Sequence, residues 1–348
     1  MKIALDVLGG DNSPHSNIDG AVDYLTEYGE NAADLILVGD QNIIKSRISN
    51  SFPYFSKIKI VHTTESIDMN ERSSRIFKEK PNSSIVKSIN FVKNKQAHAV
   101  LSAGNTGALL SSSLFLIGKI SGITRPAIAP YIPTNNGGFI LCDAGANADS
   151  KPHHLVQFAI MAEAYIEHLT GKPSPRIALL NIGSEEKKGN ELVKNAHPLL
   201  KQYCNNFIGN IESRYLMEGK AEVVVCDGFT GNIVLKLTEG IISHILEWMT
   251  SDIEILNIDS KNTKIFKNLI ESFNQNLDHE EYGATPFLGI NGIVMKCHGS
   301  STKKAIKNSL KVAQNAIEKN LINDIIYKLE KYTEINNDKE FTNEKSPI

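Results

Sequence analysis

Five short glycine-rich segments hold most of the residues that could do chemistry in this chain of 348 residues. Each segment follows an apolar run and precedes a stretch of helical length. Glycine lets the backbone approach a ligand closely, and the free N–H groups at the start of a helix favour an anion. One such turn is weak evidence, because glycine is common in every tight turn, but five predict a cleft for phosphate or another small anion. The five turns are residues 8–14, 102–107, 181–190, 227–232 and 298–302.

The candidate binding groups are the backbone and the polar side chains of these turns. The second and fourth turns would donate N–H groups to phosphate or to an oxyanion, together with the side chains of Asn105, Thr106 and Asn232. Asp6 and Asp11 would orient donors or cap a helix rather than touch phosphate. The remaining candidates are Gly9, Gly10, Ser102, Gly104, Asn181, Gly183, Glu185, Asp227, Gly228, Thr230, Gly231, Gly299, Ser300 and Ser301.

Basic side chains in the same turns could neutralise the phosphate. Lys188, with Lys187, is one candidate, although a solvated lysine pair at a helix start gives the same pattern. Lys236 follows Asn232 by four residues and would share its helix face. His298 could orient phosphate or protonate a leaving sulfur, or could be a hydrogen-bonded structural histidine. Lys188, Asn232 and His298 are the candidate catalytic residues.

Several chemistries lack their usual signature. The chain has no G-x-x-x-x-G-K-[ST], no G-x-G-x-x-G with a downstream acid, no G-x-S-x-G and no H-E-x-x-H. Its four cysteines, Cys142, Cys204, Cys226 and Cys297, are too far apart in sequence for a zinc ribbon or a redox dithiol. We therefore predict no cofactor and no metal site.

Composition indicates a globular protein without nucleic-acid partners. Hydrophobic residues make up 41%, and 37 Lys+Arg against 39 Asp+Glu leave a net charge of -2, so there is no basic excess. The N-terminal segment has an acid at position 6 and lacks the long apolar core of a signal peptide. The longest uncharged stretch, Ala97–Gly118, contains glycines, serines and Asn105 and is not typical of a membrane span. We expect a cytoplasmic protein.

Short β-branched runs alternate with helix-length segments, which predicts a mostly parallel sheet with helices on both faces. One α/β catalytic domain with two lobes would span residues 1–333, and 334–348 would be a polar tail. Gly171–Pro175 could mark the boundary between the lobes. The expected strands are Ile3–Asp6, Leu35–Val38, Ile58–His62, Ala99–Ser102, Ala127–Ile132, Phe139–Asp143, Ile177–Asn181, Val223–Cys226 and Ile293–Cys297. The expected helices are Ser83–Asn94, Thr106–Gly118, His154–Thr170, Glu191–Tyr203, Asn232–Thr250, Lys261–Asn276, Thr302–Ile317 and Asn320–Thr333.

Six strings in this order resemble the acyl-ACP:phosphate acyltransferase (PlsX) family. They are SAGNTGA, RPA, CDAGAN, NIGSEEKKGNEL, VVVCDGFTGNIVLK and HGSS, and the similarity runs from Met1 to about residue 330. The sequence departs from the family pattern at Val7-Leu8, at Ser213 and at Ala284. The first change conserves size, and the other two concern local turn geometry rather than chemistry.

The resemblance implies a fold, a reaction and several partners. The fold would be a three-layer αβα arrangement similar to isopropylmalate dehydrogenases and phosphotransacetylases. The reaction would form acyl phosphate from long-chain acyl-[acyl carrier protein] and inorganic phosphate, as the first step of bacterial phospholipid synthesis. The protein would be a homodimer, would contact the inner face of the cell membrane peripherally, and would supply a downstream membrane acyltransferase that uses acyl phosphate.

Two surface features concern these partners. Lys303, Lys304, Lys307 and Lys311 recur at helical spacing and could dock an acidic carrier protein, although an ordinary solvated face has the same pattern. Residues 248–280 would form a protruding helical tip that touches the bilayer, as the resemblance implies; a core-facing or dimer-facing helix would look alike. The apolar residues of that tip are Ile265, Phe266, Leu269, Ile270 and Phe273.

The reaction would need little beyond positioning and charge control. Phosphate is already an anion, and the leaving thiol has a pKa near 8.5, as cysteine does, so phosphate could attack the thioester directly. Three other readings stay open: a phosphotransacetylase-like enzyme that uses short acyl-CoA, a non-catalytic anion- or lipid-binding protein, and a decarboxylating dehydrogenase. No arrangement of acids clearly suggests the metal site that the dehydrogenase would need.

Overall fold

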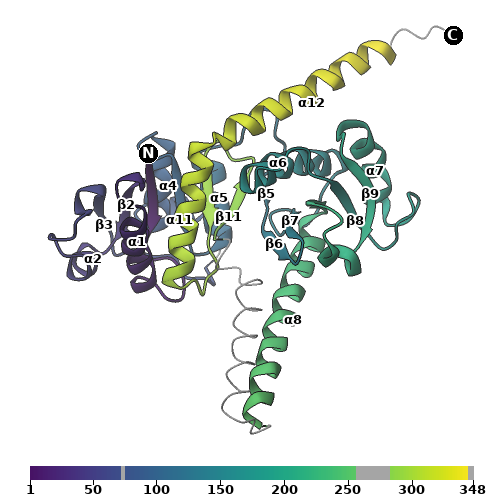
Figure 1. Cartoon of the computed structure of the whole chain (residues 1–348). Coiled ribbons are helices and arrows are strands. Elements are labelled where there is room, and N and C mark those ends of the chain that lie inside the picture. The colour runs from purple at the N-terminus through teal and green to yellow at the C-terminus, as the bar shows by residue number, and fades with distance from the viewer. Residues whose placement is uncertain (72–74, 256–282, 344–348) are drawn as a thin grey trace.

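The chain folds around two β-sheets, and the structure, a computed structural model, describes residues 1–71, 75–255 and 283–343 (Figure 1). The larger sheet has the strand order β3-β2-β1-β4-β12-β11-β5. Its first five strands in this order are parallel, whereas β11 is antiparallel to both β12 and β5. The bounds are β1 (Lys2–Asp6), β2 (Asp34–Gly39), β3 (Ile58–His62), β4 (Ala99–Ser102), β5 (Ala127–Ile128), β11 (Thr285–Leu288) and β12 (Ile293–Lys296).

The smaller sheet has the order β6-β7-β10-β8-β9 and forms the core of a second lobe. Strands β7, β10, β8 and β9 are parallel, and β6 is antiparallel to β7. Carboxyl ends of parallel strands meet at one edge, so each sheet gathers the loops that follow its strands. The bounds are β6 (Tyr131–Thr134), β7 (Gly137–Cys142), β8 (Ile177–Asn181), β9 (Phe207–Glu212) and β10 (Val223–Val225).

Helices cover both faces of the larger sheet, as its side-chain alternation requires. Ile3 and Leu5 of β1 belong to one buried apolar cluster with Ile18 of α1, while Ala4 belongs to another with Ile89 of α4. Helices α1 and α11 pack together over the first of these faces. In this first lobe the helices are α1 (His15–Tyr28), α2 (Gln41–Arg47), α3 (Ile76–Glu79), α4 (Ser84–Lys93), α5 (Thr106–Leu116) and α11 (Lys303–Glu318).

In the second lobe, α6 and α7 both pack against the sheet and against each other, and α12 packs on α6. It begins at Pro152, a favourable first-turn position for proline, and ends at Gly171, whose φ of 69° gives a left-handed cap. The helices of this lobe are α6 (Pro152–Thr170), α7 (Glu191–Tyr203), α8 (Gly228–Ile255) and α12 (Leu321–Asn343), and a 3-10 turn, η3, spans Ser213–Glu218. The whole arrangement is the three-layer α/β fold that the sequence predicts.

Helix α8 leaves the second lobe and extends away from both sheets (Figure 1). Apolar side chains along it recur about every four residues, the spacing of a single helix face. They are between 50% and 67% exposed. Within the described residues this face is therefore not covered by the protein itself. The members are Phe229, Ile233, Leu237, Ile241 and Trp248, and we call them the α8 apolar face.

Two predictions about the lobes are corrected by the structure. The expected strand Ala127–Ile132 is two strands, because β5 ends at Ile128 in one sheet and β6 begins at Tyr131 in the other. The chain passes between the lobes at residues 129–130, where Pro130 lacks an N–H group for a ladder. Gly171–Pro175, by contrast, joins α6 to β8 inside the second lobe.

The ends of the chain also differ in detail from the prediction. Helix α12 continues to Asn343, ten residues into the segment predicted as a polar tail from residue 334. Helix α1 follows the first glycine-rich turn, where the sequence indicates a helix but does not fix its bounds, and it contains Gly20, a residue that weakens helices. A Cβ on Gly20 would lie 2.6 Å from Cβ of Ile306, so this glycine lets α1 and α11 approach closely. The expected helix Lys261–Asn276 lies outside the described residues.

Candidate active site between the two lobes

Three loops of the larger sheet meet at its carboxyl edge, after β1, β4 and β12. The backbone N–H of Asp11 donates to the carbonyl of Gly299 at 2.8 Å, which joins the first loop to the third. A Cβ on Gly9 would lie 2.7 Å from the backbone nitrogen of Gly104, so glycine is required where the first loop crosses the second. Three of the five predicted turns therefore form one surface.

The buried carboxylate of Asp6 fixes the loops after β1 and β4 by hydrogen bonds. It is 1% exposed and accepts hydrogen bonds from the Ser102 hydroxyl at 2.7 Å and from the Leu8 N–H at 3.3 Å. The Ser102 hydroxyl in turn accepts from the Gly104 N–H at 3.0 Å. Burial raises the pKa of Asp6. Asp6 and Ser102 therefore position the turns and do not face a ligand.

Asp143 has the same function in the second lobe, where it follows β7. It is fully buried and accepts from the N–H groups of Ile128, Ala146 and Asn147 at 2.9, 3.1 and 2.7 Å, and from the Asn147 side chain at 2.9 Å. Burial raises its pKa too. Sequence reasoning missed this residue, although an acid directly after a strand and before a glycine-containing turn repeats the pattern of Asp6.

The start of α8 packs tightly on the Asp143 loop. A Cβ on Gly231 would lie 1.9 Å from the Asp143 carbonyl oxygen, and one on Gly228 would lie 2.5 Å from its carboxylate. Asp227 accepts from the Thr230 N–H at 2.9 Å and from its hydroxyl at 2.8 Å, which caps the helix. These four residues fix the helix rather than bind a ligand at its tip.

A cavity of about 390 Å³ lies between the loops of the larger sheet and the first turns of α8. That volume is within the range of small-molecule sites. Its walls come from both lobes, and they include Ile128, Pro130 and Leu235 as apolar patches. Predicted site residues that line it are Asp11, Thr106, Asn232, Lys236, His298, Gly299 and Ser301. This is the candidate active site.

His298 and Ser301 are ordered by their own turn. The His298 ring nitrogen Nδ1 is 2.8 Å from the Ser300 hydroxyl, and the Ser301 hydroxyl donates to the His298 carbonyl at 2.7 Å. The Asn12 side chain donates to the Ser300 carbonyl at 2.8 Å. His298 is exposed, so its ring stands at the open side of the cavity.

Four charged side chains line the cavity besides His298, two of each sign. Asp11, Lys236 and Glu239 are exposed, whereas Lys296, the last residue of β12, is largely buried. The sequence analysis did not identify Lys296 as a site residue, because in the sequence it is only a lysine near the end of an apolar strand. Its position directly before Cys297-His298-Gly299 was the available signal.

A second cavity of about 390 Å³ lies on the other side of α8, at the carboxyl edge of the smaller sheet. Asn181, Asp227 and Thr230 line it together with apolar residues such as Leu180, Leu192 and Val234. Val234 and Asn232 are two positions apart and so lie on opposite faces of the helix. The predicted residues are thus divided between two cavities.

Other predicted residues are placed elsewhere. The Asn105 side chain is 7% exposed, accepts from the Ala108 N–H at 2.9 Å and donates to the Met69 carbonyl at 2.9 Å, so it caps α5. Asn181 donates to the Lys188 carbonyl at 3.0 Å and so shapes its own turn. On that turn Glu185 and Lys188 are exposed and Gly183 is buried, and none of the three lines either cavity. Gly10, with φ of 102°, packs behind the cavity against Ala103.

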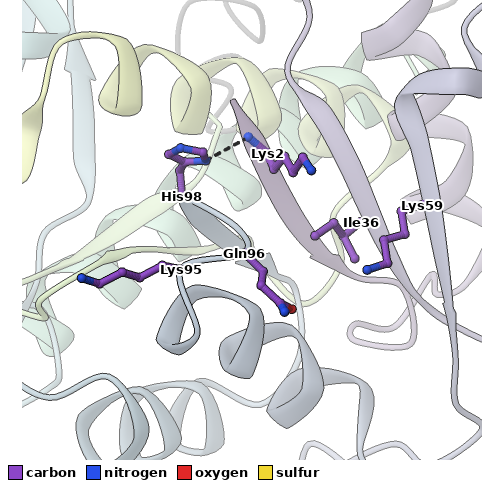
Figure 2. Close-up of a pocket in the computed structure, with 6 residues that line it drawn as sticks. All are labelled: Lys2, Ile36, Lys59, Lys95, Gln96 and His98. Carbon is purple, nitrogen blue, oxygen red and sulfur yellow. Dashed lines mark hydrogen bonds between the residues drawn. The ribbon is translucent and has the colours of Figure 1, made fainter.

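A basic hollow at the opposite, amino-terminal edge of the larger sheet is not part of this site. Lys2, Lys59, Lys95 and His98 line it, and the Lys2 N–H donates to the His98 ring at 3.1 Å. Figure 2 shows the lysine side chains pointing in different directions rather than toward one point. The hollow therefore has charge but no convergent anion site.

The lysine stripe of α11 is largely paired with acids on α1. Lys303 Nζ is 3.2 Å from Asp23, and Lys307 Nζ is 2.6 Å from Glu27. Lys311 Nζ lies 4.7 Å from the centre of the Tyr28 ring. The stripe therefore has less free positive charge than the sequence indicates. The predicted membrane residues Ile265, Phe266, Leu269, Ile270 and Phe273 lie outside the described residues.

The site offers hydrogen-bond donors and buried positive charge, with no cluster of metal ligands in the part of the chain that the structure describes. No helix among those residues is long and apolar enough to cross a membrane. Such a site can bind an anion and stabilise developing negative charge on an acyl group.

Solved structures define the class of the fold. A phosphotransacetylase from Streptococcus pyogenes matches 90% of this chain and 94% of its own with a TM-score of 0.59 and 14% identity. A branched-chain phosphotransacylase from Enterococcus faecalis V583 matches 91% and 99% with a TM-score of 0.56 and 15% identity. The protein therefore has a phosphotransacetylase-like fold.

Sequence comparison then gives the family. The model of a family described as "Fatty acid synthesis protein" matches residues 1–324. The phosphate acyltransferase of Clostridium novyi is 43% identical over 93% of this chain and 97% of its own length, and that of Desulforamulus reducens is 44% identical over 95% and 98%. The chain belongs to the phosphate acyltransferase (PlsX) family and is an acyltransferase.

Proposed function

We propose that this protein forms acyl phosphate from long-chain acyl-[acyl carrier protein] and inorganic phosphate, as the first step of phospholipid synthesis. The main support is the cavity between the lobes, where the loops after β1, β4 and β12 face the start of α8. Relatives named phosphate acyltransferase support the reaction class. Phosphate and the thioester would both fit at this junction.

The chemistry balances without a covalent enzyme intermediate. A phosphate oxygen bonds to the thioester carbonyl carbon, and the C–S bond then breaks to release a thiolate, which takes up a proton. Holding both reactants in place can lower the barrier by about 7–11 kcal/mol, and one oxyanion donor contributes about 3–4 kcal/mol. These two effects match what the cavity provides.

Three residues have specific roles in this proposal. The Asn232 amide would donate to the carbonyl oxygen as it becomes an oxyanion, and Lys236, one turn further on the same face, would neutralise charge there. His298 would orient phosphate or protonate the leaving sulfur. Lys188, exposed on the turn before α7, stays a candidate from sequence only.

One assay tests the function and separates it from its nearest rival. The protein is incubated with phosphate and either palmitoyl-[acyl carrier protein] or acetyl-CoA, and acyl phosphate is trapped with hydroxylamine. We expect product from the carrier-bound substrate. Product from acetyl-CoA alone would assign a phosphotransacetylase activity, and no product from either would favour a non-catalytic anion- or lipid-binding protein.

The partners form part of the same proposal. The protein would act as a homodimer at the inner face of the cell membrane and pass acyl phosphate to a membrane acyltransferase. The α8 apolar face supports a contact of this kind, because an uncovered apolar stripe on an extended helix suits a lipid surface or another protein. Acyl carrier protein would dock at the α11 lysines, whose positive charge complements an acidic partner.

A further inference from the structure

Lys296 is held between two of the loops that form the cavity. It is the last residue of β12, beside β4, and it lines the cavity. Its ammonium group donates to the Ala103 carbonyl at 3.2 Å and also to the carbonyl of Cys297. The side chain is thus fixed by backbone groups of the turns after β4 and β12.

The ammonium group retains hydrogen-bonding capacity after these contacts. A lysine ammonium has three N–H donors, and two carbonyls use two of them. Among the residues that the structure describes, no carboxylate forms an ion pair with Lys296. Within the part of the chain that the structure describes, a third donor and a positive charge without a paired carboxylate therefore remain at the cavity wall.

Burial makes this charge more effective than its neighbours. Lys236, Asp11 and Glu239 are exposed, so water screens them, whereas a buried charge interacts more strongly with a nearby anion. Burial lowers the pKa of Lys296, and the nearby groups of Cys297, Asp6 and Asp11 act in the opposite direction. A bound anion would favour the charged form further.

We propose that Lys296 is a phosphate-binding residue, whose ammonium donates to the attacking phosphate from β12 while its other donors hold the turns after β4 and β12. The inference rests on the proposed function, because it names the residue that binds that substrate. Thr106, from the turn after β4, would add a hydroxyl donor from the first lobe.

Calorimetric titration with inorganic phosphate tests the inference independently of turnover. The variants are Lys296→Gln, which keeps a donor but removes the charge, Lys296→Arg, and Lys93→Met as a control on the exposed end of α4. We expect the dissociation constant for phosphate to rise about 10- to 100-fold in Lys296→Gln, the loss typical of a hydrogen bond to a charged group. Lys296→Arg should retain more affinity than Lys296→Gln, and Lys93→Met should bind as the wild type does.

Kinetics by the hydroxylamine trap separate binding from loop positioning. In Lys296→Gln the KM for phosphate should rise by a similar factor, while the KM for the acyl donor changes less than about threefold. A variant that unfolds at the wild-type temperature yet binds phosphate normally would overturn the inference, as would a rise in the donor KM alone. Wild-type protein that binds phosphate through Lys296 but makes no acyl phosphate would refute the proposed function and leave this inference standing.

Discussion

The polar side chains predicted for the site fall into two groups, which differ in whether the protein itself uses their hydrogen-bonding capacity. Ser102, Asn105 and Asn181 bind backbone groups of neighbouring turns, so their hydrogen-bonding capacity serves the fold. Asn232 and Lys236 face the cavity from α8, and no hydrogen bond within the described residues occupies either side chain. Substitutions in the first group should affect stability, and those in the second should affect rate.

Asn232→Ala should lower kcat for acyl phosphate formation by roughly 10²-fold, the effect of losing one oxyanion donor. The residue lines the cavity and does not cap its helix, so the unfolding temperature should change little. The hydroxylamine assay measures this variant together with His298→Ala and Lys188→Ala, so all three candidate catalytic residues are tested. Near-normal rates in all three variants would refute the site assignment.

Two glycines of α8 should respond in opposite ways to alanine. Gly231→Ala places a Cβ 1.9 Å from the Asp143 carbonyl oxygen and should destabilise the protein by about 1–3 kcal/mol. Among the described residues no atom lies within 4 Å of a Cβ added at Gly240, so Gly240→Ala should stabilise by about 0.5–1 kcal/mol. Urea unfolding measures both. Equal effects would show that the contact between α8 and the Asp143 loop is not tight.

At the scale of elements, Glu222 joins β10 to the segment before β8. It is 9% exposed and accepts from Arg176 at 2.8 Å and from Lys172. Burial alone would raise its pKa, but the hydrogen bonds from Arg176 and Lys172 outweigh burial and lower it to about 2. A lowered folded pKa means that the stabilisation is present above the unfolded value and is lost as the pH falls toward 2.

Glu222→Gln should therefore reduce the free energy of unfolding by about 3 kcal/mol at pH 7, with the difference shrinking between about pH 4.5 and pH 2. Urea unfolding at a series of pH values gives the profile. Glu218→Gln, at the end of η3, removes an exposed pair with Lys220 and should show almost no such dependence. A pH-independent difference for Glu222→Gln would contradict the assignment.

A second prediction at the scale of elements concerns the lysine stripe of α11. Reversing charge at Lys304 and Lys311 should raise the KM for acyl-[acyl carrier protein] with little change in kcat, because docking precedes chemistry. Lys303 and Lys307 form ion pairs with acids of α1 and Lys311 contacts the Tyr28 ring, so the unfolding temperature of each variant is measured beside its KM. Lys93→Glu on α4 is the control, and an unchanged KM in the double variant would exclude this dock.

At the scale of the whole molecule, we expect the intact protein to float with anionic liposomes. The sequence places the contact in residues 248–280, and the α8 apolar face leads toward that region. The double variant Ile265→Asp/Leu269→Asp should lose flotation while keeping its unfolding temperature. Unchanged flotation in the folded variant would place the membrane contact elsewhere.

Sequence alone could predict the alternation of strands and helices, because buried strand runs such as Ile177–Asn181 are strongly patterned. It could also predict the turns at one edge, since glycine and polar residues follow each strand. It could not assign Asn105 to a cap or divide Asn181 and Asn232 between two cavities, because that depends on which helix face meets which sheet. Lys296 was missed for the same reason.

Helix α8 runs from the cavity to a part of the molecule that lies away from both sheets (Figure 1). Its first turns hold Asn232 and Lys236 at the cavity, and its 28 residues form a rod about 42 Å long. Asn232 lies next to Gly231, where the first turn of the helix packs against the Asp143 loop. Because the helix is continuous, we expect a contact made at its far end, with a bilayer or another protein, to shift these two side chains at the cavity as well.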